Sequence, residues 1–254
     1  MPLGPSCLIT GASSGLGRAL AVALAAPGQR LLLGGRNEAR LAETAALCEA
    51  RGAETSTAAI DVTDAPAMQG WIGGAGRLEL VIANAGISAH TAGLAGAEAT
   101  RAIFATNLGG MLNTVLPALE AMEIQPPGPD GRRGPIATIN SLAAFVASPA
   151  APAYCAAKAA ADCWILATAP IAERKGIGLA SICPGFIRTP MTEAHTLPKP
   201  GMMSAERAAA LILAGIASGR RRVAFPRSLY LAGRMASLLP PRTAARLLTL
   251  RSGG

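Results

Sequence analysis

The sequence predicts a single α/β domain with a doubly wound sheet of about seven parallel strands and helices on both faces. Three observations support this fold class. Short apolar runs alternate with longer helical stretches, the runs lack the two-residue alternation of half-exposed strands, and no linker divides residues 1–254. A chain of 254 residues is also long enough to bury one large core.

The individual elements follow from these runs. Leu31-Leu32-Leu33 and Leu80-Val81-Ile82 are apolar at consecutive positions, as expected for strands covered on both faces. The seven predicted strands lie near residues 6–10, 30–34, 55–60, 78–83, 135–140, 177–183 and 222–225. The main predicted helices lie at 15–26, 37–51, 100–123 and 152–174. The Pro- and Gly-rich segment 125–135 is predicted to be an exposed loop between a helix and a strand.

Composition and charge exclude several classes of protein. The chain is 51% hydrophobic and 15% charged, which excludes a disordered protein. Only 3% of residues are aromatic and no nucleic-acid-binding motif occurs, so we expect no nucleic-acid partner. The net charge of +8 is unevenly distributed along the chain. Nine arginines and no acid follow Glu206, so the basic character belongs to the C-terminal segment.

The five cysteines are scattered and odd in number, and none forms a C-x-x-C pair. Neither histidine lies near a cysteine pair, so we expect no metal site and no disulfide framework. A reducing, cytoplasmic location fits this pattern, and the N-terminus lacks the form of a signal peptide. No uninterrupted apolar run reaches the ~18 residues of a membrane-spanning helix.

A glycine-rich segment, TGASSGLG at 10–17, follows the first predicted strand and opens an Ala- and Leu-rich helix. Glycines at such a turn allow a pyrophosphate to approach the helix N-terminus closely, as in Rossmann-type dinucleotide-binding domains. The spacing is G-x-x-x-G-x-G. An ordinary turn followed by a helix cap is the alternative.

The end of the second predicted strand bears on cofactor choice. In dinucleotide-binding folds an acid at this point binds the ribose 2′-hydroxyl of NAD. Here the strand ends at Gly35-Arg36, and Arg36 can pair with a 2′-phosphate. We therefore predict NADP(H), the alternative being that Arg36 is simply solvated at the start of the next helix.

Tyr154 and Lys158 are spaced by four residues on the predicted helix 152–174, which places them on one face. A neighbouring ammonium, aided by a bound nicotinamide, is expected to lower the pKa of the phenol from about 10. Tyr154 would then donate a proton in carbonyl reduction and accept one in the reverse direction. Without further context the pair could equally be a solvent-facing helix pair.

With these motifs in order, the sequence resembles the classical short-chain dehydrogenase/reductase family over about residues 6–225. The glycine segment fits the family's T-G-x-x-x-G-x-G pattern, and Ala83-Asn84-Ala85-Gly86 fits N-N-A-G except at the first Asn. Ser141 lies 13 residues before Tyr154, the family's usual spacing, and Asn107 lies where the family has an active-site Asn. Asp61-Val62 and Pro184-Gly185 with Thr189 match two further family motifs.

The resemblance implies a role for each matching residue. Ser141 would hydrogen-bond the substrate oxygen, Tyr154 would transfer the proton, and Lys158 would also hold the nicotinamide ribose. Asn107 would order a helix kink and a relay water, and Asn84 would steady the central sheet. The implied cofactor-binding residues are Gly11, Ser13, Ser14, Gly15, Leu16, Gly17, Arg36, Asp61, Val62, Asn84, Ala85, Gly86, Tyr154, Lys158, Pro184, Gly185, Ile187 and Thr189.

The sequence therefore predicts an NADP(H)-dependent oxidoreductase that interconverts a small-molecule carbonyl and a secondary alcohol. This function has two alternatives. Gly11-Ala12-Ser13-Ser14-Gly15 fits the G-x-S-x-G pattern of a serine hydrolase, with His195 further along the chain, but this interpretation leaves Tyr154 and Lys158 unexplained. A non-catalytic NADP-binding or scaffold protein on the same fold is the second alternative.

The last predictions concern subunit assembly and the segments 190–204 and 228–254. The resemblance implies a homodimer or homotetramer paired through helices 100–123 and 152–174. Residues 190–204 are predicted to form a substrate flap with an apolar lining of Met191, Leu197, Met202 and Met203. Residues 228–254 are predicted to form a helical extension, with a second basic helix over 242–251. Packing on the substrate-side rim or a neighbouring subunit is favoured over peripheral contact with an anionic membrane.

Overall fold

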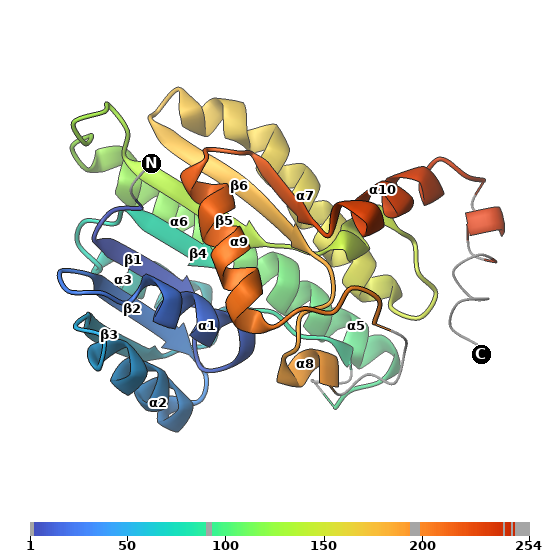
Figure 1. Ribbon diagram of the computed structural model, residues 1–254, viewed down its shortest axis with the longest axis horizontal. Helices are drawn as coiled ribbons and strands as arrows, with labels where there is room; N and C mark the ends of the chain where they lie inside the picture. The colour runs from blue at the N-terminus through green and yellow to red at the C-terminus, as the bar shows by residue number, and fades with distance from the viewer. Residues whose placement is uncertain (1–2, 90–92, 194–198, 241, 245, 247–254) are drawn as a thin grey trace.

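The computed structural model describes residues 3–89, 93–193, 199–240, 242–244 and 246. At its centre, one sheet of seven parallel strands runs in the order β3-β2-β1-β4-β5-β6-β7 (Figure 1). This doubly wound order confirms the predicted Rossmann-type fold. The strands are β1 Ser6–Thr10, β2 Arg30–Gly35, β3 Glu54–Ala59, β4 Leu80–Ala83, β5 Gly134–Ile139, β6 Ile177–Pro184 and β7 Arg222–Phe225.

Helices cover both faces of the sheet because consecutive apolar strand residues point in opposite directions. In β1, Cys7 and Ile9 pack into the core shared with α1 Gly15–Leu24, α2 Glu38–Glu49 and α9 Ala205–Ala217. Leu8, between them, packs into the opposite core. That second core is shared with α3 Ala65–Gly73, α6 Gly110–Ile124 and α7 Pro152–Glu173.

The prediction of one continuous helix over 100–123 is wrong in detail. The helix begins earlier, as α5 Gly96–Phe104, and a π-helical turn over Ala105–Gly109 precedes α6. A π turn inserts one residue without changing the apolar pattern, so periodicity does not show it. Its consequence is local: the turn carries Asn107, which is 1% exposed.

The segments that directly follow β6 and β7, with α8 and α10, lie at the carboxyl ends of these strands (Figure 1). In the predicted flap, Pro190–Glu193 forms the short helix α8, while His195 and Leu197 lie outside the described residues, as does most of the predicted helix 242–251. Helix α10, Arg227–Ala236, packs against the 3₁₀ turn Leu142–Phe145.

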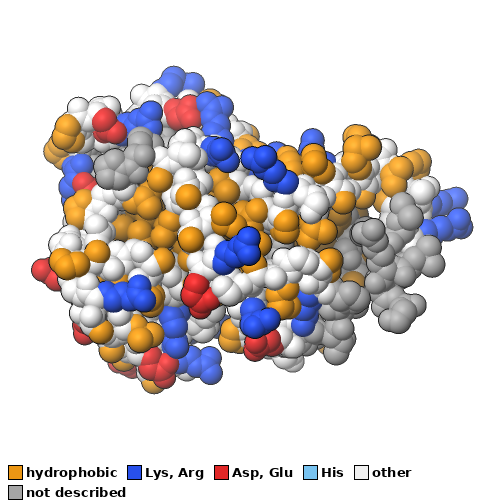
Figure 2. Space-filling model, in the orientation of Figure 1, with side chains coloured by type: hydrophobic (Ala, Val, Ile, Leu, Met, Phe, Trp, Pro, Cys, Tyr) orange, Lys and Arg blue, Asp and Glu red, His pale blue; other side chains and the backbone are white. Residues whose placement is uncertain are grey.

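This contact of α10 agrees with the packing alternative for the C-terminal segment. Four large apolar side chains nevertheless remain exposed on or just after α10: Leu231, Met235, Leu238 and Leu239. Hydrophobic side chains are visible on the surface in this part of the molecule (Figure 2). A peripheral contact of α10 and the residues after it with an anionic membrane therefore stays a prediction.

Two helical stretches, 96–124 and 152–173, are long and apolar enough to cross a membrane by length and composition. The sequence expectation concerned uninterrupted apolar runs, and polar residues interrupt both of these stretches. Both stretches contribute buried residues to the core. All five cysteines are free thiols, and only Cys163, on α7, is exposed.

Candidate active site

A cleft of about 790 Å³ opens at the carboxyl ends of the parallel strands. The loops after β1, β2, β3, β4, β5 and β6 line it, together with one face of α7. Doubly wound sheets bind ligands at this edge, where the strand order reverses between β1 and β4.

The glycine segment forms the floor of the cleft between β1 and α1. Gly11 (φ +67°) and Gly15 (φ +54°) adopt left-handed backbone conformations that favour glycine. A Cβ at Gly17 would overlap the carbonyl oxygen of Gly11, so only glycine allows α1 to start this close to the strand. The helix N-terminus thus faces the cleft with little side chain in front of it.

Asn84, just after β4, ties this loop to the centre of the sheet. Its Nδ2 donates to the carbonyl oxygens of Thr10 (2.9 Å) and Gly11 (3.2 Å). The Thr10 hydroxyl accepts in return from the backbone N–H groups of Asn84 (3.1 Å) and Ala85 (3.2 Å). Ala83, which replaces the first Asn of the family motif, is buried, so this tie does not depend on that position.

Two arginines lie at the end of the cleft near β2. Arg36 has a 68% exposed side chain, and its Nη1 is 3.8 Å from Asp61 Oδ2. Arg40, one helical turn later, also lines the cleft. Asn37 caps α2 by accepting from the backbone N–H of Arg40 at 2.9 Å. Within the described part of the chain, the Arg36 guanidinium is held only by this weak, exposed ion pair and is available to an anion.

At the other end of the cleft, Asn107 and Lys158 lie behind Gly86. Asn107 clamps the chain after β4: Oδ1 accepts from Ile87 N (2.8 Å) and Nδ2 donates to Ile87 O (2.9 Å). The Lys158 Nζ donates to the Ile139 carbonyl at 2.7 Å. A Cβ at Gly86 would lie 3.1 Å from Asn107 Oδ1 and 3.6 Å from Lys158 Nζ, so any larger residue at this position would crowd the Asn107 amide.

Tyr154 and Ser141 approach each other at this same end. Ser141 caps the turn after β5, where its Oγ accepts from Ala143 N at 3.1 Å. Burial raises the pKa of Tyr154 to about 12, and a side-chain hydrogen bond with Ser141 opposes this rise. Lys158 is not among the groups that shift this pKa here, so the lowering expected from Lys158 together with a bound nicotinamide stays a prediction. The Lys158 Nζ lies 5.8 Å from the centre of the Tyr154 ring, and the protein interior disfavours the phenolate.

Lys158 responds to the same environment in the opposite sense. Burial lowers the pKa of Lys158 to about 8, because no described carboxylate faces its ammonium and the carbonyl of Ile139 is its hydrogen-bond acceptor. At neutral pH the pair is therefore a neutral phenol beside an ammonium ion.

The structure brings together nearly all residues that the sequence singled out. Every predicted cofactor-binding residue lines the cleft, as do Ser141, Tyr154 and Lys158. Asn107 does not; it lies directly behind the wall. Met191 and Thr192, from the predicted flap 190–204, also line the cleft. Cleft residues that the sequence analysis missed include Asn37, Arg40, Ile60, Thr106 and Asn140. Only Arg40 had a usable signal, its position four residues after Arg36 on the predicted helix.

Comparisons with known proteins agree with this geometry. The model of the short chain dehydrogenase family matches residues 6–199. This chain belongs to that family. It is also 33% identical over 240 residues to an uncharacterized oxidoreductase of Myxococcus xanthus, covering 92% of each chain.

Two further relatives place the short chain dehydrogenase in context. It is 32% identical over 195 residues to a putative ketoacyl reductase of granaticin polyketide synthesis in Streptomyces violaceoruber, covering 74% of this chain and 70% of the relative. A short chain dehydrogenase/reductase from Burkholderia phymatum, solved in complex with NAD, has a TM-score of 0.80 at 23% identity, with 92% of each chain covered. The chain is thus an oxidoreductase of the short chain dehydrogenase family.

Proposed function

We propose that this chain transfers hydride between NADP(H) and a carbonyl/secondary alcohol pair, with Tyr154 as general acid and base. One observation carries the proposal. The phenol of Tyr154, its Ser141 partner and the Lys158 ammonium converge at one end of a cleft whose other end is a glycine-lined helix N-terminus. A dinucleotide and its substrate have this extent and these needs, since the pyrophosphate requires N–H donors and the carbonyl that is reduced beside the nicotinamide requires a nearby proton donor.

The cleft fits a dinucleotide by shape. Gly11, Gly15 and Gly17 remove the side chains that would fill the space over the start of α1. The bound cofactor would supply the hydride; the protein supplies orientation and protons. Arg36 and Arg40 support NADP(H) over NAD(H), because two guanidinium groups border the site at the end of β2, where an NAD-selective acid would otherwise stand.

Proton transfer follows from the state of the three side chains. A raised pKa keeps Tyr154 protonated at neutral pH, ready to donate to the oxygen of a carbonyl substrate. The Ser141 hydroxyl can donate to that same oxygen as negative charge develops on it. Lys158, positively charged below pH about 8, stabilises the phenolate left behind. Asn107 holds the loop after β4 in place.

A ketone or ketoacyl compound is the proposed substrate. Met191, which follows the Thr189–Pro190 step, offers a flexible apolar side chain at the cleft. The similarity to a putative ketoacyl reductase supports carbonyl reduction in the same direction.

The test is a panel of ketones and ketoacyl thioesters assayed by consumption of NADPH and, separately, of NADH. We expect turnover with NADPH to exceed turnover with NADH. No turnover of any carbonyl despite tight NADPH binding would favour the scaffold alternative. A fluorophosphonate probe covers the hydrolase alternative, and we expect Ser13 to stay unlabelled.

Assembly and location complete the proposal. We expect a homodimer or homotetramer, because α6 and α7 expose the large apolar side chains Leu116 and Ile171. Light scattering at micromolar concentration tests this, and a monomer would contradict it. We place the protein in the cytoplasm, where five free thiols stay reduced.

A further inference from the structure

Arg222, on the edge strand β7, lies between two groups that are far apart in the sequence. On one side its guanidinium makes two contacts with Asp162 of α7: Nε to Oδ1 at 3.2 Å and Nη2 to Oδ2 at 2.5 Å. On the other side it lies over the ring of Phe145, with 5.1 Å between Cζ and the ring centre. Arg222 follows residue 199, where the match to the family model ends.

The Asp162 side leads through buried hydrogen bonds to the residue before Ser141. The Ser181 hydroxyl donates to Asp162 Oδ1 at 2.6 Å. Ser181 in turn accepts from Asn140 Nδ2 at 2.8 Å. All three of these side chains are at most 5% exposed. The chain just before Ser141 is thereby anchored to α7 and β6.

The Phe145 side leads to the other flank of Ser141. Phe145 is the last residue of the turn that Ser141 caps. Tyr230 of α10 packs edge-on against it at 5.1 Å, and Gly233 brings the helix backbone close. Arg222 also hydrogen-bonds the Tyr230 side chain. Both flanks of Ser141 therefore end at the same guanidinium.

We propose that Arg222 is a positioning residue: it holds the Ser141 turn between Asp162 and Phe145 and so fixes the Ser141 hydroxyl against the substrate oxygen. The proposal rests on the proposed function. An Arg is suited to this task because its planar group can stack on a ring and bind a carboxylate with two nitrogens at once. A Lys can do only the second, as a point charge.

Stability alone is a poor reason for such a pair. Asp162 is buried, whereas the Arg222 side chain is 28% exposed, so forming the pair costs desolvation chiefly of the carboxylate. Apolar replacements of ion pairs with buried charges are often at least as stable. Around it the cores of the sheet are apolar. An ion pair placed at the end of the turn that carries Ser141 is better explained by what it orients.

The first test compares Arg222→Met and Arg222→Lys with Arg221→Met. Arg221 is the matched control, since it is the preceding residue and pairs with Glu173 on the surface. For the Arg222 variants we expect kcat to fall about 10- to 100-fold, the scale of a misplaced catalytic group, with KM for NADPH unchanged. Arg221→Met is expected to keep kcat within twofold. The Asp162→Asn/Arg222→Met double variant, which leaves no unpaired charge, covers the case in which Arg222→Met does not fold.

The second test asks whether Arg222 acts through Ser141. In a double-mutant cycle, the Asp162→Asn/Arg222→Met change is expected to have little further effect on kcat once Ser141→Ala is present. An equal fall in both backgrounds, or wild-type kcat in a folded Arg222 variant, would overturn the proposal.

A third readout does not depend on activity. Amide hydrogen exchange at Ala143, Ala144 and Val146, whose N–H groups bond within the turn, is expected to speed up in the Arg222 variants and not in Arg221→Met. Unchanged exchange would count against the proposal that Arg222 holds the Ser141 turn. If the wild-type protein reduces no carbonyl, the proposed function fails, while this measurement still shows whether Arg222 holds the turn.

Discussion

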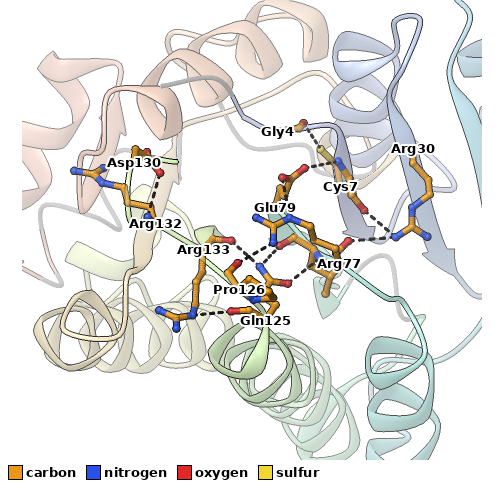
Figure 3. Close-up of polar contacts among 12 residues, drawn as sticks. Gly4, Cys7, Arg30, Arg77, Glu79, Gln125, Pro126, Asp130, Arg132 and Arg133 are labelled. Atoms are coloured by element: carbon orange, nitrogen blue, oxygen red, sulfur yellow. Dashed lines mark hydrogen bonds and ion pairs between the residues drawn. The ribbon is translucent and has the colours of Figure 1, made fainter. Parts of the chain in front are cut away.

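The sheet has an amino edge, where its parallel strands begin, and a carboxyl edge, where they end. These two edges use their polar groups in opposite ways. At the amino edge, a pocket of about 330 Å³ is lined by Arg77, Arg132, Arg133, Glu79 and Asp130 among others. Its arginines are already engaged (Figure 3): Arg77 binds Glu79 (3.1 Å) and the Pro126 carbonyl (2.8 Å). Arg133 binds the carbonyls of Gln125 (3.0 Å) and Lys175 (2.8 Å).

At the carboxyl edge, some of the groups that face the cleft remain available for a ligand. Among the described residues, Arg36 has only a 3.8 Å contact with Asp61, and glycines leave the start of α1 uncovered. The amino edge is rich in charged side chains, and its arginines bind a carboxylate and backbone carbonyl groups. The comparison teaches that polar groups still available for a ligand, more than the density of charge, distinguish a site from a structural network.

The largest effect is expected at the carboxyl edge, at Tyr154. Tyr154→Phe removes the proton donor and leaves the ring, so turnover should fall at least ~10²-fold. NADPH binding, followed by fluorescence titration, should stay near the wild-type value. Turnover within a few-fold of wild type would show that Tyr154 is not the proton donor. It would also contradict the assignment of the reaction to the carboxyl edge.

The next effect concerns Arg36. A charge-assisted contact with a 2′-phosphate contributes about 1.5–3 kcal/mol, or roughly 10- to 150-fold in affinity. Arg36→Ala should narrow the preference for NADPH over NADH by that factor, measured as the ratio of kcat/KM values. Arg51→Ala is the control for net charge, because Arg51 bonds the Val22 carbonyl at the far end of α2. Equal use of both cofactors by the wild type would contradict the assignment.

A smaller, pH-dependent effect is expected from Lys158. Its lowered pKa of about 8 means that the ammonium loses its proton as the pH rises through that value. Tyr154, with a pKa of about 12, stays protonated over the same range. The value of kcat/KM for NADPH, which reports the free enzyme, should therefore fall above pH about 8, by up to tenfold per pH unit. A flat profile from pH 7 to 9.5 would show that the charge is dispensable.

The smallest kinetic effect is expected at the amino edge. Arg133→Met should leave kcat and KM within twofold of wild type, because its guanidinium serves two backbone carbonyls. Loss of these bonds should lower the free energy of unfolding by about 1–3 kcal/mol, measurable by urea denaturation. A tenfold loss of activity with unchanged stability would mean that the two edges are coupled.

The strands and the cofactor loop were predictable because each has a local cause. Strands buried on both faces must be apolar at consecutive positions, and the loop needs glycine where φ is positive or space is short. All seven strands lie within three residues of their predicted positions at either end. Tyr154 and Lys158 were predictable from their spacing on one helix.

What escaped the sequence depends on contacts between distant segments. The π turn at Asn107 leaves the apolar pattern intact. The raised pKa of Tyr154 comes from burial that no local pattern shows. The network of Asp162, Ser181 and Arg222 joins residues up to 60 positions apart. Its only trace in the sequence is an acid at Lys158+4, in an otherwise apolar stretch of helix.

The cysteine pattern described above provides a practical reporter. Burial raises the pKa of Cys7 and Cys183 to about 12, so a mild alkylating dye should leave both unmodified. Cys163 is the one exposed thiol, and it lies on the helix through which we expect subunits to pair. A dye at Cys163 therefore places one fluorophore per chain beside that contact. Self-quenching that disappears on dilution would measure assembly without any engineered residue.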